Sequence, residues 1–486
     1  MKVATTAARA LGKKLPKHAQ ISVRSFSAAQ AQPSLDMELP GIPPLSPASA
    51  QPKPETKITT LANGLRVASE ETYGQVSTIG MFIDAGSRYE NDSNSGVSHL
   101  LEHMAFKSTE NRSHLRLVRD IEDVGGTVGA ASSRECIMYT GECLRDNVET
   151  IVDVMADSIL RPALKPWDIE DQREVIGYEL QAMEQNAQAL LTELLHSAAY
   201  GESTPLGQPL WCPERNLGKL NADTIRSFMS KTFLAKRMVL SGAGVDHDEL
   251  VSLAEKYFAD LATAPPAGET EPAMLPSPYK GGDRRVSGDS PFTHVALCFD
   301  AGSWMSDDLL ELCTLHLLLG GGGSFSAGGP GKGMYSRLYT NVLNQHHWVD
   351  SATAFNSMYA DAGLIGIYGT CLPQDAGRLV DVMSAELISI AGSAPGEEET
   401  NRAKNQLKSS MLMKLESRQV LFEDIGRQIL TYGKRESPAE LCARVDKVTP
   451  EGIQKIAKKA LSSPVTVASF GNNSEIPAYE EIAKKF

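Results

Sequence analysis

Three features that the sequence lacks narrow the class of protein. It has no uninterrupted apolar run of the roughly 18 residues that a membrane-spanning helix needs. Its seven cysteines include no Cys-x-x-Cys pair, and an odd, dispersed set is a poor disulfide framework, which favours a reducing compartment. Its first 34 residues contain no aspartate or glutamate. We therefore expect a globular protein that reaches a membrane only through a partner.

The acid-free segment has the composition of a targeting signal. Residues 1–34 are rich in alanine and serine and carry six lysines and arginines. This composition is typical of a mitochondrial presequence, which takes no part in the fold; a disordered basic tail is the alternative. Residues 35–56 form a proline-rich, extended lead-in. The segment predicts a mitochondrial location, in the matrix or on the matrix side of the inner membrane.

The rest of the chain is acidic and long enough for more than one core. The whole chain has 47 basic and 60 acidic residues, so 41 basic residues remain once the six in the N-terminal segment are set aside. An acidic body repels nucleic acid and favours basic ligands. With 486 residues, of which 42% are apolar, the chain should form two or more domains.

One short motif carries the clearest chemistry. In His99-Leu100-Leu101-Glu102-His103 the two histidines stand at positions i and i+4, so a helix would place both rings on one face. Glu102 lies beside them at i+3. Two histidines that can reach one ion, with a neighbouring carboxylate to act as a base, form the pattern of a zinc peptidase. The leucines would bury the opposite face of the helix.

A second copy of this region follows later in the chain. Residues 81–87 (MFIDAGS) are matched by 297–303 (LCFDAGS), and the His99–His103 motif is matched by His316-Leu-Leu-Leu-Gly320. The second copy has lost both the acid and the second histidine, so only the first half can hold a metal. Residues 263–286 are rich in proline and glycine and predict a linker between an N-terminal domain at 57–262 and a C-terminal domain at 287–486. Strands and helices without regular βαβ alternation favour an α+β fold, with two homologous halves that face each other and enclose a chamber.

The third metal ligand has to come from another helix, because one helix face cannot close a three-ligand site. A helical pattern from Trp167 to about Tyr200 carries Glu179, which lies 76 residues beyond His103. At this point the sequence resembles the inverzincin metallopeptidases of the pitrilysin group, and within them the processing peptidases of mitochondria. The resemblance covers residues 57–470. It implies that His99, His103 and Glu179 hold zinc, and that Glu102 polarises the attacking water and passes its proton to the leaving amine.

Two positions depart from the catalytic members of this family. Gln172 stands where they carry an acid seven positions ahead of the distal ligand, and Gly129 stands where they carry the asparagine of an Asn-Ala pair on the strand that pairs with substrate. In the second half, Tyr359 resembles a tyrosine that the family places near substrate.

A long glycine loop is the third departure. It resembles the loop of the family's substrate-recognising α-type subunits, which pair with a catalytic β-type subunit. A phosphate-binding loop is disfavoured because Lys332 is followed by glycine and not by serine or threonine; a plain flexible linker stays open. The loop residues expected to contact substrate are Gly320, Gly321, Gly322, Gly323, Ser324, Phe325, Gly328, Gly329, Gly331, Lys332 and Gly333.

The resemblance therefore implies a recognition subunit. Its partners would be a β subunit in a heterodimer and the basic presequences of imported precursor proteins, which suit an acidic body. Chains of this type also resemble core subunits of respiratory complex III, so that role stays open. Two alternatives are a self-sufficient zinc endopeptidase of β type, favoured by the complete set of four site residues, and a purely structural core protein, favoured by the departures.

Overall fold

The computed structural model describes residues 54–321 and 334–486. The predicted presequence, the lead-in up to residue 53 and the loop residues from Gly322 to Gly333 lie outside these ranges. All of the described residues belong to one compact unit, Pro54–Phe486. No helix in the described residues is long and apolar enough to cross a membrane.

The first half is built on a six-stranded sheet in the order β1-β2-β6-β3-β5-β4. Its strands are β1 Lys57–Thr60, β2 Arg66–Glu70, β3 Val76–Ile83, β4 Thr127–Ser132, β5 Ile137–Leu144 and β6 Met238–Ala243. Its helices are α1 Val97–Met104, α2 His114–Glu122, α3 Val148–Leu160, α4 Pro166–Glu184, α5 Ala187–Tyr200, α6 Glu214–Leu217, α7 Ala222–Thr232 and α8 His247–Tyr257.

The second half is built on a five-stranded sheet in the order β7-β11-β8-β10-β9. Its strands are β7 Gly282–Val286, β8 Thr293–Asp300, β9 Val349–Met358, β10 Gly363–Cys371 and β11 Thr466–Phe470. Its helices are α9 Leu309–Leu319, α10 Ala376–Gly392, α11 Glu397–Leu415, α12 Arg418–Tyr432, α13 Pro438–Val445, α14 Pro450–Leu461 and α15 Tyr479–Ala483, and residues Leu338–Leu343 form a short π-helix.

The two sheets have the same topology, which confirms the predicted duplication. In each sheet one pair of strands is parallel, β2 with β6 and β7 with β11, and the other pairs are antiparallel. Strands β2, β6, β3, β5 and β4 thus correspond to β7, β11, β8, β10 and β9, and β1 is an addition. The fold is α+β with two homologous halves, as the sequence predicts.

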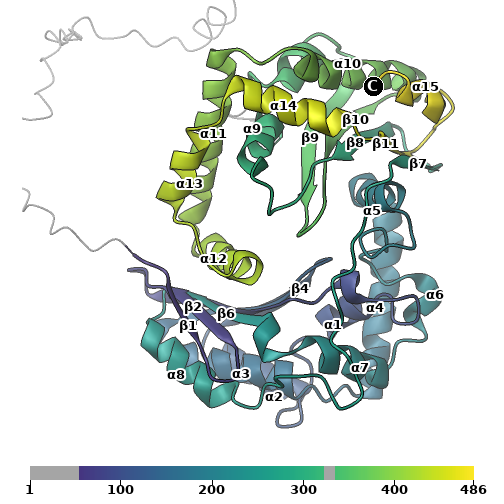
Figure 1. Ribbon diagram of the computed structural model, residues 1–486. Helices are drawn as coiled ribbons and strands as arrows, with labels where there is room; N and C mark the ends of the chain where they lie inside the picture. Colours follow the sequence, from purple (N-terminus) through teal and green to yellow (C-terminus); the bar gives the residue numbers. More distant parts are fainter. Residues whose placement is uncertain (1–53, 322–333) are drawn as a thin grey trace, which may run out of the picture. The chain divides into compact units, whose positions relative to one another are not determined.

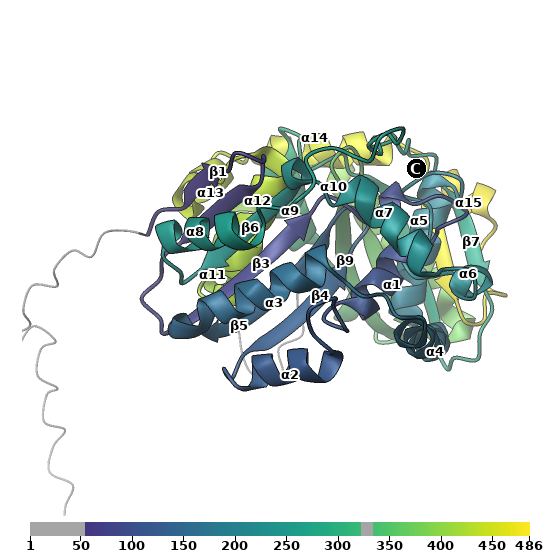
Figure 2. The ribbon, with the colours of Figure 1, turned by 90° about the horizontal axis from the view of Figure 1, so that it is seen from below.

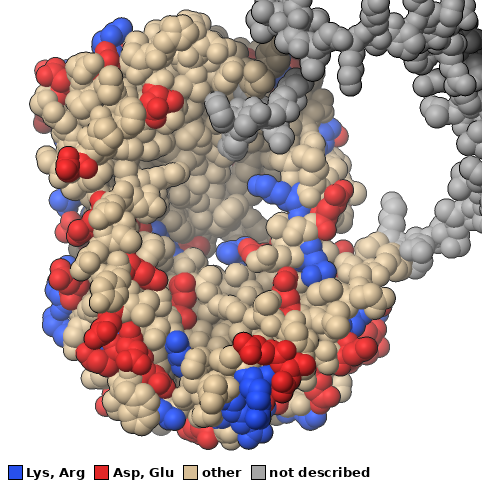
Figure 3. All heavy atoms as spheres, turned by 180° about the vertical axis from the view of Figure 1, so that it is seen from behind, with Lys and Arg blue, Asp and Glu red and all other residues tan. Residues whose placement is uncertain are grey.

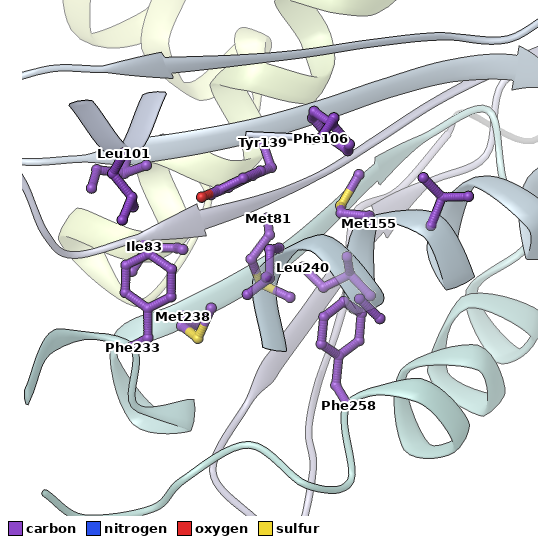
Figure 4. Packing of buried hydrophobic residues seen from close by; sticks show 14 of the residues in the cluster. Met81, Ile83, Leu101, Phe106, Tyr139, Met155, Phe233, Met238, Leu240 and Phe258 are labelled. Carbon is purple, nitrogen blue, oxygen red and sulfur yellow. The ribbon is translucent and has the colours of Figure 1, made fainter. Parts of the chain in front are cut away.

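The core of the first half lies between its sheet and a layer of helices. Alternate residues of β3 point to opposite faces, so Met81 and Ile83 pack with Tyr139 and Leu240 in one cluster (Figure 4). Phe82 points to the other face and packs with Phe422. Helices α3 and α8 lie on one face of this sheet and α12 on the other (Figures 1 and 2). Both faces are therefore buried, which explains the nearly continuous burial of β3.

Each half supplies a helix to the sheet of the other half. α12 follows β10 in the sequence but packs on β3 and β6 of the first sheet, where its apolar residues join Phe82 and Val239. α5 precedes the linker but packs on β7, β8 and β11 of the second sheet, where Leu191 and Leu195 belong to the same buried cluster as Ala296 and Ala468. The two halves are thus joined by a reciprocal exchange of helices.

Two local predictions need correction. The expected helix from Trp167 to Tyr200 is two helices, α4 and α5, because Asn186 caps the second and accepts a hydrogen bond from the main-chain N–H of Ala189. The linker predicted at 263–286 ends in a strand, since Gly282–Val286 pairs in parallel with β11. This edge strand reads Gly-Asp-Arg-Arg-Val, which lacks the apolar alternation that would reveal it.

Candidate metal and peptide site

Helix α1 carries the histidine motif, and a buried acid fixes where it begins. Gly96 takes a left-handed conformation, with φ at 95°, directly before the helix, and a side chain there would collide with Cys212. The carboxylate of Glu90 accepts hydrogen bonds from the main-chain N–H groups of Gly96 at 2.6 Å and Ser98 at 2.7 Å. Burial raises the pKa of Glu90, and these two N–H bonds oppose the shift. Glu90 therefore anchors the helix that presents the motif; the sequence analysis did not single it out.

The three predicted ligands come together at one point. Glu179 on α4 places Oε2 3.0 Å from Nε2 of His103 and 3.4 Å from Nε2 of His99, and the two histidine nitrogens lie 3.3 Å apart. Ligand atoms at about 2.0–2.1 Å from a tetrahedral zinc lie roughly 3.3–3.4 Å from one another. The two histidines and one carboxylate thus fit a zinc ion in donor type and in spacing. They are the single cluster of three metal-binding side chains within the described ranges.

The surroundings of His99 hold its ring in place. Trp211 packs against the ring with 5.1 Å between centroids, and the main-chain N–H of Cys212 donates to Nδ1 at 3.2 Å. Burial, with a smaller contribution from His103, lowers the pKa of His99 to about 4. The ring is therefore neutral at neutral pH. Because Nδ1 accepts the bond from Cys212, the proton of the neutral ring lies on Nε2. With an ion at Nε2, the neutral ring would carry its proton on Nδ1 and the bond from Cys212 would be lost.

Glu102 does not join the ligand cluster but reaches the neighbouring strand. Its Oε2 accepts hydrogen bonds from the main-chain N–H of Ser132 at 2.8 Å and from its hydroxyl at 2.7 Å. Ser132 is the last residue of β4, and β4 is the edge strand of the first sheet. The outer side of β4 has no partner strand within the described residues, so its main chain can pair with an extended peptide beside the motif.

Comparison with known proteins places the chain in a family. The family model described as insulinase, peptidase family M16, matches residues 66–214, and the model described as the M16 inactive domain matches residues 219–407. The mitochondrial-processing peptidase subunit alpha of Solanum tuberosum is 43% identical over 435 residues, which cover 89% of this chain and 85% of the relative. The chain belongs to peptidase family M16.

Other relatives are also named as α subunits, and the similarity covers most of their length. The probable mitochondrial-processing peptidase subunit alpha-1 of Arabidopsis thaliana is 42% identical over 96% of this chain and 92% of its own length. The human mitochondrial-processing peptidase subunit alpha is 38% identical over 94% and 91%. The similarity therefore extends over both halves and not over one motif.

In the second half, the start of the glycine loop packs beside His316, which is the counterpart of His99. The Nε2 of His316 on α9 hydrogen-bonds the carbonyl oxygen of Ala354 on β9 at 3.1 Å. Gly321 packs so close to this ring that no side chain fits there, and it forms a parallel bridge with Ala354. Gly320 accepts hydrogen bonds from the same edge strand. The remaining predicted loop contacts, from Gly322 to Gly333, lie outside the described residues.

The other positions noted in the sequence have defined places. Gln172 is half-buried on α4, and Gly129 sits inside β4 opposite Thr140. Tyr359 is half-buried directly after β9, and its hydroxyl lies 2.6 Å from Nε2 of His196 on α5. It is thus engaged in a contact between the two halves.

Polar contacts between the two halves surround Tyr359. The main-chain N–H of Ala360 donates to both oxygens of Glu135, and Arg88 bonds both Glu135 and Asp361. Glu135 and Arg88 belong to the first half and the turn at 359–361 to the second. These contacts join residues far apart in the sequence, so no local pattern reveals them.

Proposed function

We propose that this chain is the substrate-recognising α subunit of a heterodimeric mitochondrial processing peptidase. The heterodimer of this chain with a β subunit would work in the mitochondrial matrix and remove presequences from imported precursor proteins. The observation that carries the proposal is the similarity over nearly the whole chain to proteins named as α subunits, at 38–43% identity. Membership of respiratory complex III as a core subunit would be compatible with this role.

Two features of the surface support a role in peptide recognition. The edge of β4 can pair with an extended peptide, and the glycine loop starts at the edge of β9, the equivalent strand of the second half. We assign the contacts with substrate to the loop residues from Gly320 to Gly333. The net negative charge of the chain favours basic peptides. Acidic and basic side chains are interspersed on the face shown in Figure 3, so this face is not a surface of one sign of charge.

The ligand cluster would give this subunit the elements of hydrolytic chemistry. A zinc ion held by His99, His103 and Glu179 would supply Lewis acidity toward a peptide carbonyl. Glu102 accepts two hydrogen bonds at Oε2, which leaves Oε1 to take a proton from water and deliver it to the leaving amine. The Ser132 bonds hold this carboxylate at the end of the strand on which a peptide would lie.

The intact cluster favours one second candidate, a self-sufficient zinc endopeptidase. The spacing of its three ligand atoms is what supports this alternative. The two candidates differ in what the isolated chain can do, because a recognition subunit needs its partner for cleavage.

The test is to purify the chain alone and with its β partner, and to measure bound zinc by mass spectrometry and cleavage of a presequence peptide. We expect no cleavage by the lone chain, cleavage by the heterodimer, and a heterodimer rate that Glu102→Gln leaves unchanged. Glu174→Gln, an exposed change on α4, is the matched control. Cleavage by the lone chain that Glu102→Gln abolishes would establish the endopeptidase instead.

The role of the loop has its own measurement. Deletion of residues 322–333 should weaken binding of a presequence peptide to the heterodimer, whereas removal of the exposed linker residues Pro266–Gly268 should not. Equal affinity of the two deletion variants for the presequence peptide would contradict a role of the loop in recognition.

A further inference from the structure

A cavity of about 910 Å³ lies between residues of both halves and adjoins the candidate site. Its volume is within the range of roughly 300–1,000 Å³ that binding pockets for organic ligands occupy. Strand β10 and the ligand cluster do not line it. Its walls come from the turn after β4, the start of α9, the face of α12 and the end of α13.

The cavity shares two stretches of chain with the site. Ser132 holds Glu102, and the next four residues, from Ser133 to Cys136, line the cavity. Leu210 lines the cavity as well, and the residue after it, Trp211, packs on the ring of His99. β4 runs toward this wall, so a peptide paired with β4 that continues past Ser132 reaches the cavity.

Exposed apolar side chains gather along the lining. Met274, Trp304, Met305 and Tyr432 line the cavity and are 40%, 40%, 61% and 36% exposed. Large apolar side chains that remain in water mark sites of interaction when they are grouped. Methionine is flexible and adapts to ligands of different shape.

Charge does not decide what this cavity binds. Five carboxylates and four basic side chains line it, and several are already paired within the chain, such as Glu436 with Arg444 and Arg134 with Glu193. The rim is also firmly built, since the carbonyl oxygen of Trp304 accepts a hydrogen bond from the hydroxyl of Tyr432 and its N–H donates to the carbonyl oxygen of Tyr359. The selective feature is therefore the apolar surface.

We propose that this cavity binds large apolar side chains of a peptide whose neighbouring segment lies along β4. The proposal rests on the proposed function, because it assumes a peptide substrate. It assigns to this chain a selectivity for aliphatic and aromatic residues that is separate from any attraction for basic residues.

The experiment measures binding of two fluorescent peptides to the full heterodimer by anisotropy. Both peptides carry the same arginines; one carries leucine and phenylalanine, and in the other these are replaced by serine. Met305→Glu and Trp304→Ala should each weaken binding of the apolar peptide by about tenfold and leave the serine peptide unchanged, because only the first fills the cavity.

Met413→Glu is the control. Met413 is 61% exposed, as Met305 is, but lies on α11 outside the lining. Equal affinities of the Met305 and Met413 variants for an apolar peptide that binds the wild type would overturn the cavity proposal and leave the proposed function intact. Failure of the wild type to bind either peptide would contradict both the cavity proposal and the proposed function. As a second readout, a benzophenone group in place of the phenylalanine should crosslink to Met274 or Met305; adducts confined to other regions would also overturn it.

Discussion

At the scale of single residues, the position of the metal cluster depends on groups outside it. Glu90 fixes the start of α1, Ser132 holds Glu102, and Trp211 and Cys212 hold His99. None of these residues belongs to the five-residue motif. A site of this kind keeps its geometry only while these supporting contacts are present.

Glu90→Gln should destabilise the protein. Glutamine has one acceptor oxygen, so one of the two N–H groups at the start of α1 loses its partner inside the protein, at a cost of about 1–3 kcal/mol. Urea denaturation measures this loss, and zinc titration should show weaker binding because α1 is less firmly held. Glu255→Gln, an exposed change on α8, should alter the free energy of unfolding by less than about 0.5 kcal/mol. Equal stability of the two variants would contradict the anchoring role.

Protonation of His196 should set part of the acid sensitivity. Burial, and then the charge of Arg134, lowers the pKa of His196 well below its ordinary value of 6.5. The unfolded chain therefore binds a proton that the folded chain does not, and stability falls as the pH drops below 6.5. His196→Gln should reduce this slope by about 1.4 kcal/mol per pH unit between pH 6 and 5.

The slope is obtained from urea denaturation at pH 7, 6 and 5. His347→Gln changes an exposed histidine and should leave the slope as it is in the wild type. An unchanged slope in the His196 variant would contradict the lowered pKa that burial and Arg134 give to this ring.

At the scale of elements, two glycines allow α12 to lie close to the first sheet. A side chain at Gly80 would collide with the ring of Phe422, and one at Gly426 would collide with the ring of Phe82. The two phenylalanine rings lie 5.0 Å apart between centroids, tilted by 41°, and each lies opposite the glycine of the other element. This complementary arrangement explains why a helix interior carries a residue that ordinarily weakens helices.

Gly426→Ala should therefore destabilise the protein by about 1–3 kcal/mol in spite of the better helix propensity of alanine, because the methyl group overpacks the contact with Phe82. Gly392→Ala, at the end of α10, meets no atom within 4 Å and should be neutral or stabilising by up to about 1 kcal/mol. Thermal unfolding measures the stability of the two variants. A loss of stability in the Gly392 variant alone would contradict the close packing at Gly426.

Much of this could be predicted from the sequence. The hairpins, the α1 motif and the repeat of residues 81–87 are local patterns, and the repeat predicted the duplication. The convergence of Glu179 on the histidines was implied by the resemblance to the family and not by a local pattern. The break at Asn186 is also a local signal, which a continuous helical pattern on both sides concealed. The contacts of Cys212 with His99 and of Tyr359 with His196 join residues more than a hundred positions apart, so they follow from the packed chain and not from any short pattern.

At the scale of the whole molecule, the exchange of α5 and α12 makes each half depend on the other. Residues 57–262 expressed alone would leave the face of the first sheet that carries Phe82 and Val239 without α12. This fragment should be insoluble or aggregate, whereas residues 54–486 should be soluble and monodisperse in size-exclusion chromatography. A soluble, cooperatively unfolding fragment would contradict the interdependence.

Cleavage within the exposed linker should have a milder result. A protease that cuts at Pro266–Gly268 in the intact chain should yield two fragments that elute together, because the exchanged helices still hold the halves. Fragments that separate without denaturant would show that the exchange contributes little to their association.

The exchange also sets an order in time. As the chain emerges N-terminus first, the sheet of the first half is complete at β6, but α12 follows about 175 residues later. At a synthesis rate of about 5–20 residues per second, that sheet waits roughly 10–35 s with an uncovered apolar face. The nascent protein is most prone to aggregation during this interval, and a chaperone that binds apolar strands should act mainly then.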